Sequence, residues 1–402
     1  MCALYVTRIF SWTIKLCAHT TSNAMLTYQM QESEVILTGA GLVSSLGLDI
    51  NDACAAFRAG ISRASKTDML LLNEETNEFE QLVAHQVPLI GSGFVDYSRI
   101  LGFATKAFEE TLRSYRGELI FDERMGVYLC LQELGEPTSV KVYNKNDNSN
   151  NHFKAHNFGK QLLNKLSDLF SYSIPDSNQY LSLSGHAGIA ILLEKAISDL
   201  NSGKIDRCIV GGVESYLNSQ SIEWLNKTRL LKTSNMPVGM QPGEAGAFII
   251  LERKEKANAR SWCNFDFEME VGVDFEENHT LSQRTSFGRG LQNAISKALT
   301  KKGDTKKIGG DCWVISDLNG ECHRAHEWGA ALVKLLAVSP IFKDVTVWYP
   351  AMSFGDTGAS SGIILICCAL IAIQRGYSPS NSVFIVLSSY TGERGSIYIS
   401  KK

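Results

Sequence analysis

The chain has 402 residues, of which 44% are hydrophobic, and its 39 Lys and Arg against 42 Asp and Glu give a net charge of −3. This balance is typical of a globular protein with a sizeable core, and it excludes a broad basic surface for nucleic acid or an anionic membrane. Ten cysteines are scattered without CxxC pairs, which favours a reducing compartment, the cytoplasm, and predicts neither a metal site nor a cofactor. No apolar run reaches the roughly 18 residues of a membrane span.

Residues 1–24 do not resemble the beginning of a domain. Arg8 and Lys15 interrupt their apolar stretch, which argues against a signal peptide. The segment Ser22-Asn23-Ala24 stands directly before Met25 and indicates an upstream extension or a cloning remnant. We therefore expect 1–24 to be a disordered N-terminal extension and the native protein to begin near Met25, with Met1 as the other possible start.

Strands and helices are predicted to alternate along most of the chain. We expect strands at 35–38, 127–131, 181–184, 207–210, 247–251, 313–316, 345–349, 383–387 and 396–400. Helices are expected at 51–59, 100–115, 187–200, 291–299, 329–338 and 362–373. Such alternation predicts an α/β fold with parallel-rich sheets that are buried on both faces. The polar, Asn-rich segment 144–156 is expected to be a mobile surface loop.

Four segments, in order, resemble β-ketoacyl synthases of the thiolase-fold family. They are the strand and glycine turn of 35–44 (VILTGAGLVS), the NSGKID and VGGVE of 201–214, the PGEAGA through LE of 242–252, and the glycine-rich turn of 355–362. Each is weak alone because glycine turns recur widely, but their order and spacing are specific.

The resemblance implies a duplicated thiolase-like fold. Its two halves would be 25–255 and 256–402, each with a mixed five-stranded sheet, in a layered α-β-α-β-α arrangement. A shared plan of glycine-flanked turn, apolar helix and glycine stop in 186–203 and 356–376 also favours a duplication. The resemblance further implies a homodimer, or a heterodimer with a related chain, joined through a strand near the nucleophile region.

Family members carry a cysteine at the beginning of a buried helix, where the helix dipole favours its thiolate, and two histidines that polarise the thioester carbonyl. Aligning the motifs places His186 at the cysteine position and Asp317 and Asp356 at the two histidine positions. Ser184 is the nearest alternative nucleophile. Because no cysteine occurs between Cys130 and Cys208, a small register shift cannot supply the thiol.

The family's closing glycine-rich loop also departs from its pattern. Here 389–395 reads SYTGERG, and Tyr390, Thr391 and Gly392 are the expected pocket-loop residues. Bulkier and charged residues replace glycines that would let the backbone approach a substrate.

These substitutions argue against Claisen condensation, because an ionised Asp repels the oxyanion that a histidine would stabilise. Three ordinary structural roles compete with any functional one: Asp356 capping the next helix, Asp317 stabilising a turn, and His186 as a satisfied core histidine. A sharper alternative is that the three converge to orient a general base or hold a divalent metal. The segment 321–328 (ECHRAHEW) is expected to be a polar loop entering a helix, since its spacing fits no standard zinc motif.

The favoured hypothesis is a degenerate, non-condensing bacterial protein that acts as a binding or partner subunit in an acyl or polyketide pathway, or as an accessory protein of secretion cargo. It would contact acyl carrier protein or acyl-CoA. One alternative is an acyltransferase or hydrolase that uses Ser184 or His186. Another is a functional 3-oxoacyl synthase with displaced catalytic residues, such as Cys130.

Overall fold

The computed structural model describes residues 34–73, 75–132, 148–257, 259–300 and 312–402, with backbone alone for 148–156. The expected N-terminal extension, 1–24, lies outside these residues. No helix in the described ranges is long and apolar enough to cross a membrane.

Two five-stranded sheets form the framework. The first has the order β1-β7-β6-β4-β5 and the second β10-β9-β11-β12-β8. Their strands are β1 Val35–Ser44, β4 Met125–Leu131, β5 Gln179–Ser182, β6 Arg207–Ser215, β7 Glu244–Arg253, β8 Phe267–Phe275, β9 Cys312–Ser316, β10 Val345–Trp348, β11 Ser382–Ser388 and β12 Glu393–Lys401.

The two sheets repeat one topology. In the first, β4 runs parallel to β5 and β6, whereas β7 is antiparallel to β6 and β1. In the second, β9 runs parallel to β10 and β11, whereas β12 is antiparallel to β11 and β8. Each strand therefore has a counterpart in the other sheet, in the same chain order, which confirms the predicted pair of mixed five-stranded sheets.

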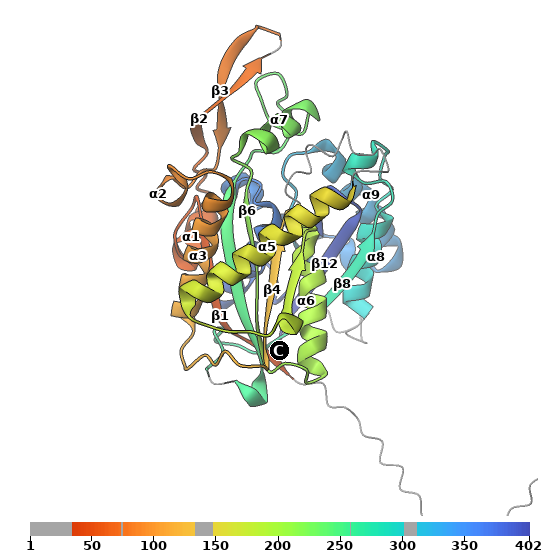
Figure 1. Cartoon of the computed structure of the whole chain (residues 1–402). Helices are drawn as coiled ribbons and strands as arrows, with labels where there is room; N and C mark the ends of the chain where they lie inside the picture. Colours follow the sequence, from red (N-terminus) through yellow and green to blue (C-terminus); the bar gives the residue numbers. More distant parts are fainter. Residues whose placement is uncertain (1–33, 74, 133–147, 258, 301–311) are drawn as a thin grey trace, which may run out of the picture. The chain divides into compact units, whose positions relative to one another are not determined.

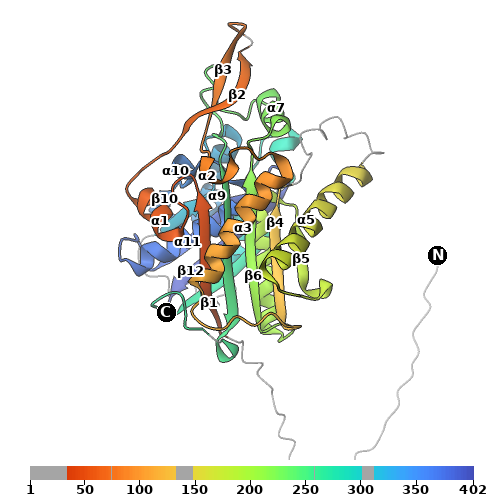
Figure 2. The same ribbon diagram turned by 60° about the vertical axis from the view of Figure 1, so that its left-hand side comes forward.

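Helices cover both faces of each sheet, as Figures 1 and 2 show. They are α1 Ile50–Arg58, α2 Pro88–Gly91, α3 Asp96–Ser114, α5 Asn148–Phe170, α6 Gly185–Asn201, α7 Ser219–Lys227, α8 Arg289–Thr300, α9 Cys322–Val338, α10 Ala351–Phe354 and α11 Ser361–Gln374. α3 and α5 pack on the outer face of the first sheet, and α8, with α9 against it, on the outer face of the second. α6 and α11 contact each other and both sheets, so they form the central layer.

The sequence of α11 explains its central position. All residues from Ser361 to Ile373 are buried and none of them carries a charge. A helix that is apolar on every side has no face to offer to water, so it is stable only when it is enclosed on all sides. Its counterpart α6 is also mostly buried, and the two helices bring the turns that precede them to the middle of the molecule.

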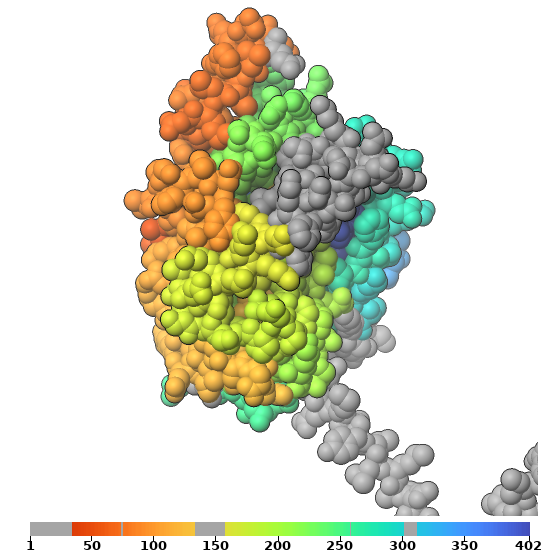
Figure 3. Space-filling model, in the orientation of Figure 1, coloured from red at the N-terminus to blue at the C-terminus, as the bar shows by residue number. Residues whose placement is uncertain are grey.

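Several parts of the fold differ from the expectations. The prediction of a loop at 144–156 is wrong from residue 148 onward, because α5 begins there, and 144–147 lie outside the described residues. The later turns of α5 bury Leu162, Leu163 and Leu166 in the core, and this packing outweighs the polar composition of the first turns. The hairpin of β2 (Ser65–Asn73) and β3 (Glu78–Ala84) was not anticipated, and in the space-filling view it stands out from the body (Figure 3). α7 and β8 were also missed.

Candidate active site

His186 and Asp356 meet between the two halves of the fold. His186 lies in the first turn of α6, and Asp356 lies in the turn between α10 and α11. Gly355 supports this turn with a left-handed φ of 75°, a conformation that costs glycine little. Gly212 of β6 lets the backbone that follows Asp356 approach closely, because a Cβ at Gly212 would lie 2.0 Å from the Ala359 carbonyl oxygen.

The His186 ring is hydrogen-bonded at both nitrogens. Its Nε2 lies 2.8 Å from Asp356 Oδ1, and Arg324 Nη2 lies 3.3 Å from its Nδ1. A guanidinium group only donates, so Nδ1 accepts and the Nε2–H donates to Asp356. This arrangement leaves His186 without a free lone pair, and therefore unable to act as a general base in the geometry observed.

Asp317 does not touch His186 directly, because Arg324 stands between them. Arg324 Nη1 donates to Asp317 Oδ2 at 2.8 Å, and its Nε donates to Glu321 Oε2 at 3.1 Å. The Ser388 amide also donates to Asp317 Oδ2, at 2.7 Å. Arg324 is 4% exposed, so one buried cation links Asp317, Glu321 and His186.

The carboxylate of Asp356 has further donors of its own. Asn319 Nδ2 donates to its Oδ2 at 2.6 Å, and the Gly358 amide donates to its Oδ1 at 2.9 Å. Burial acts to raise the pKa of Asp356, but His186, Arg324 and Asn319 outweigh it and hold the pKa well below its usual range. Asp356 is therefore ionised, and it places negative charge beside His186.

Arg324 is held in its charged form by the same groups. Burial acts to lower the pKa of its guanidinium, but Asp317 and Glu321 raise it well above the ordinary value. Tyr390 adds a wall: its hydroxyl donates to Glu321 Oε1 at 2.8 Å, and its ring lies 5.2 Å from the Arg324 guanidinium. We call this set, Asp317, Asn319, Glu321, Arg324, Asp356, His186 and Tyr390, the Arg324 network.

The expected alternative nucleophiles are poorly placed. Ser184 precedes α6, and its carbonyl oxygen accepts a hydrogen bond from Ser389 Oγ; no base contacts its hydroxyl among the described residues. Cys130 lies at the end of β4 and its thiol donates to the Gly185 carbonyl oxygen at 3.2 Å. Burial, with a contribution from Glu214, raises the pKa of the Cys130 thiol far above its usual range, which disfavours the nucleophilic thiolate.

The loop after β11 forms one side of the site. Ser389, Tyr390 and Thr391 line the pocket beside His186, whereas Gly392 does not; instead it packs on the Phe275 ring. Arg394 fixes this loop from behind, since its Nη1 donates to the carbonyl oxygens of Ser389, Thr391 and Glu393. Its Nη2 donates to Glu327 Oε2 of α9 at 2.9 Å. The arginine therefore anchors the loop and does not project into the pocket.

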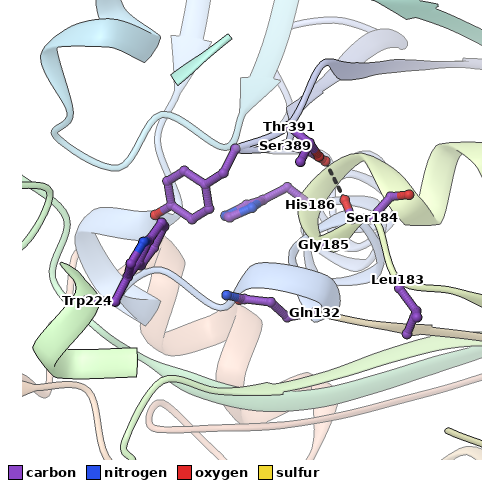
Figure 4. A pocket seen from close by; sticks show the side chains of 9 residues that line it. Gln132, Leu183, Ser184, Gly185, His186, Trp224, Ser389 and Thr391 are labelled. Atoms are coloured by element: carbon purple, nitrogen blue, oxygen red, sulfur yellow. Dashed lines mark hydrogen bonds between the residues drawn. The ribbon is translucent and has the colours of Figure 1, made fainter. Parts of the chain in front are cut away.

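The pocket next to His186 is small. Figure 4 shows the side chains of His186 from α6, Trp224 from α7 and Gln132, which directly follows β4, around this pocket. Its volume is about 30 Å³, room for a few water molecules at most. On the other side of Asp356 a second void has only about 10 Å³. Typical small-molecule sites have about 300–1,000 Å³, so the described residues leave no space for an acyl chain here.

Glu214 lies behind the Asp356 turn. It is fully buried at the end of β6, and its Oε2 accepts from the Ala359 amide at 3.3 Å. Burial raises the pKa of Glu214 to about 8, and the negative charge of Asp356 adds to the shift. Glu214 is therefore mostly protonated at neutral pH, so the site carries less negative charge than its carboxyl groups suggest.

Of the three ordinary structural roles, the contacts of the described residues match the one expected for His186 and neither of those expected for the two aspartates. His186 is a satisfied core histidine. Asp356 does not cap α11, whose N-cap is Ser360 without a side-chain bond; it accepts from the Gly358 amide within its own turn instead. Asp317 accepts from Ser388 on the neighbouring strand and not from its own turn.

Sequence reasoning missed Arg324, Glu321, Asn319 and Trp224. The expectation for 321–328 is wrong in one respect: α9 begins at Cys322, so this segment is already helical. Glu321, Arg324 and Glu327 are spaced by three residues and are all buried. Charged residues at helical spacing on the same face as Trp328 and Leu335 were the signal that could have revealed them. The described residues contain no group of three or more His, Cys, Asp or Glu that could hold a metal ion.

No family model matches the chain, and no curated protein matches it. Solved structures do. The ishigamide ketosynthase/chain length factor superposes with a TM-score of 0.69 at 16% identity, covering 92% of this chain and 100% of that chain. A type II polyketide synthase acyl-carrier protein in complex with its ketosynthase bound to the hexaketide gives 0.69 at 16%, covering 92% and 99%. A β-ketoacyl synthase from Burkholderia phymatum STM815 gives 0.66 at 17%, covering 92% and 100%.

These structural superpositions establish the fold. The chain has the thiolase-like fold of ketosynthases and chain length factors, as the four sequence segments predicted.

Proposed function

We propose that the chain is a ketosynthase-fold protein without condensing activity, which acts as a binding or partner subunit for a chain of the same fold. The Arg324 network is the observation that carries the proposal. At the three positions that would hold a cysteine and two histidines, it forms a closed set of buried hydrogen bonds in which His186 has no free lone pair and Asp356 is ionised.

Each requirement of condensation is opposed by a feature of this set. The buried thiol next to the site, Cys130, is held protonated. Asp356 would repel the developing oxyanion, and the loss of one oxyanion donor already costs about 2.7–4 kcal/mol. The small pocket excludes an extended acyl group. The same points argue against hydrolysis or acyl transfer through Ser184, because none of the described residues places a free base against its hydroxyl.

A partner role in an acyl or polyketide pathway is supported by the similar structures, which include a ketosynthase/chain length factor and an acyl-carrier protein in complex with its ketosynthase. β5 is an edge strand of the first sheet and leads into α6, so it is the strand through which the expected homodimer or heterodimer would form. The scattered cysteines of the sequence keep the cytoplasm as the expected location.

The test is intact-protein mass spectrometry after incubation with acyl-CoA and with acyl carrier protein thioesters, together with an assay of malonyl-thioester decarboxylation. We expect neither a covalent adduct nor turnover. The positive comparison is the triple variant His186→Cys, Asp317→His and Asp356→His, which restores the family residues. An adduct on the unmodified protein that disappears in Cys130→Ser or Ser184→Ala would overturn the proposal and identify the nucleophile.

Association is measured separately, by light scattering over a wide concentration range. We expect an assembly of at least twice the 44.3 kDa of the chain, either alone or after co-expression with a ketosynthase-like chain. A mass that stays at 44.3 kDa in both experiments would contradict the partner role.

A further inference from the structure

A further pocket lies away from both voids of the candidate site, between the C-terminal ends of α1 and α11. Its volume is about 280 Å³, close to the lower limit of small-molecule sites and far above the volume beside His186. Its lining combines three apolar residues with two arginines and a tyrosine: Ala55, Ala59, Ile371, Arg58, Arg375 and Tyr377. We call it the arginine pocket.

Both arginines of this pocket are held in place by uncharged groups. The Arg58 guanidinium lies 4.3 Å from the centre of the Tyr377 ring, a cation–π contact. Arg375 Nη2 donates to Asn51 Oδ1 at 2.9 Å. Within the described part of the chain neither arginine forms an ion pair, and no Asp or Glu lines the pocket. Two positive charges therefore face one cavity without a counter-ion from the protein.

The negative ends of the helix dipoles of α1 and α11 compensate only part of the positive charge of the two arginines. Each helix C-terminus carries about half a negative charge, so the ends of α1 and α11 together offset about one of the two positive charges. Neither guanidinium donates to a helix carbonyl among the hydrogen bonds of the described residues, since Arg375 bonds Asn51 and Arg58 stacks on Tyr377. A net charge of about +1 remains for a ligand.

Tyr377 forms a packed base beneath Arg58. Its ring stacks on Trp348 with centroids 6.2 Å apart, and Trp348 in turn contacts Trp313 edge-on at 4.8 Å. Burial raises the pKa of the Tyr377 hydroxyl to about 12, so this group keeps its proton at neutral pH and does not repel an anion.

We propose that the arginine pocket binds a phosphate monoester whose organic part is compact and apolar. The phosphate would be held between Arg58 and Arg375, because guanidinium groups match phosphate oxygens in geometry and the pocket keeps a net positive charge that favours an anion. The apolar part would lie on Ala55, Ala59 and Ile371, whose small or aliphatic side chains leave the space open. The site is separate from the Arg324 network, so this inference does not depend on the proposed function.

Isothermal titration calorimetry of the full chain with phenyl phosphate at pH 8 and low salt tests the proposal. At this pH the ester is a dianion, since its second pKa is about 6. We expect saturable one-to-one binding that weakens at least tenfold in Arg58→Gln and in Arg375→Gln. Arg63→Gln is the matched control, because this exposed arginine lies five residues beyond Arg58 and outside the pocket lining, and its affinity should stay within about twofold of the original.

Ala55→Leu separates shape from charge, because it fills the cavity and keeps both arginines. It should weaken phenyl phosphate several-fold and leave inorganic phosphate unchanged. A phosphotyrosine peptide, compared with phenyl phosphate, shows whether the ester comes from a protein or a free metabolite: tighter binding of the peptide assigns it to a protein, and equal or weaker binding to a metabolite. The proposal would be overturned if neither phenyl phosphate nor the phosphotyrosine peptide bound saturably. Equal affinity of Arg58→Gln, Arg375→Gln and the original protein for phenyl phosphate would also overturn it.

Discussion

Replacing Arg324 with Met tests whether the Arg324 network is a charge-balanced part of the core. Methionine replaces the aliphatic part of the side chain but removes the guanidinium cation that donates to Asp317 and Glu321 at 2.8 and 3.1 Å. Removing one partner of a buried ion pair costs about 3–5 kcal/mol, because the remaining charge stays buried without compensation. His186 Nδ1 also loses its donor, at about 1–3 kcal/mol for an unsatisfied buried group. We expect Arg324→Met to lower the free energy of unfolding by at least about 3 kcal/mol at pH 7, measured by urea denaturation.

The control for this variant is Arg113→Met. Arg113 also bonds two carboxylates, Glu109 and Glu110, but its side chain is 60% exposed, and exposed pairs contribute about 0–1 kcal/mol. Adding Asp317→Asn and Glu321→Gln to Arg324→Met should recover most of the loss. A cost for Arg324→Met as small as that for Arg113→Met would refute the reasoning.

The pH dependence of the same variant gives a second test. In the unmodified protein the pKa of Asp356 is lowered, so its contribution to stability is present above its unfolded pKa and is lost as the pH falls below it. Arg324 is one cause of this lowering. The stability difference between Arg324→Met and the unmodified protein should therefore be largest near pH 7 and shrink as the pH falls through about 4. A difference that does not shrink as the pH falls from about 4 toward the lowered pKa of Asp356 would show that lost packing, and not charge, dominates.

Three further outcomes follow from the site. Because the pKa of Glu214 is raised to about 8, the unmodified protein should lose stability as the pH rises from about 4.5 to 8. The free energy of unfolding of Glu214→Gln should therefore rise relative to that of the unmodified protein by up to about 1.4 kcal/mol per pH unit over this range. Equal dependence of the two unfolding free energies on pH would contradict the raised pKa. His186→Cys alone should not decarboxylate malonyl thioesters, since Asp356 remains beside the new thiol and raises its pKa; turnover by this single variant would contradict the electrostatic argument. Arg394→Met should lower stability by about 3–5 kcal/mol, because Glu327 stays buried without a partner, and should make the 389–393 loop sensitive to limited proteolysis; an unchanged digestion pattern would show that the loop is held by other contacts.

The convergence of the expected site residues was predictable only through the family resemblance. His186 and Asp356 are 170 residues apart and form a direct hydrogen bond, and nothing in the local pattern of either segment indicates the other. The resemblance placed both at the same site because their positions lie together in the fold. It could not supply Arg324, since that residue acts through the position of α9 and lies 138 residues from its partner His186.

The sequence by itself determined the alternation of strands and helices and the burial of α11, because strand and helix periodicity and an uninterrupted apolar segment are local properties of the chain. It did not determine where α5 begins, since packing of its later turns against the core decided this, and it did not indicate the β2–β3 hairpin. Charge compensation also depended on the tertiary structure. Asp317, Glu321, Asp356 and Arg324 appear in the sequence as ordinary charged residues, and only their burial at hydrogen-bonding distance turns them into a closed network, because the strength of a charge interaction depends on separation and surroundings in space and not on position in the chain.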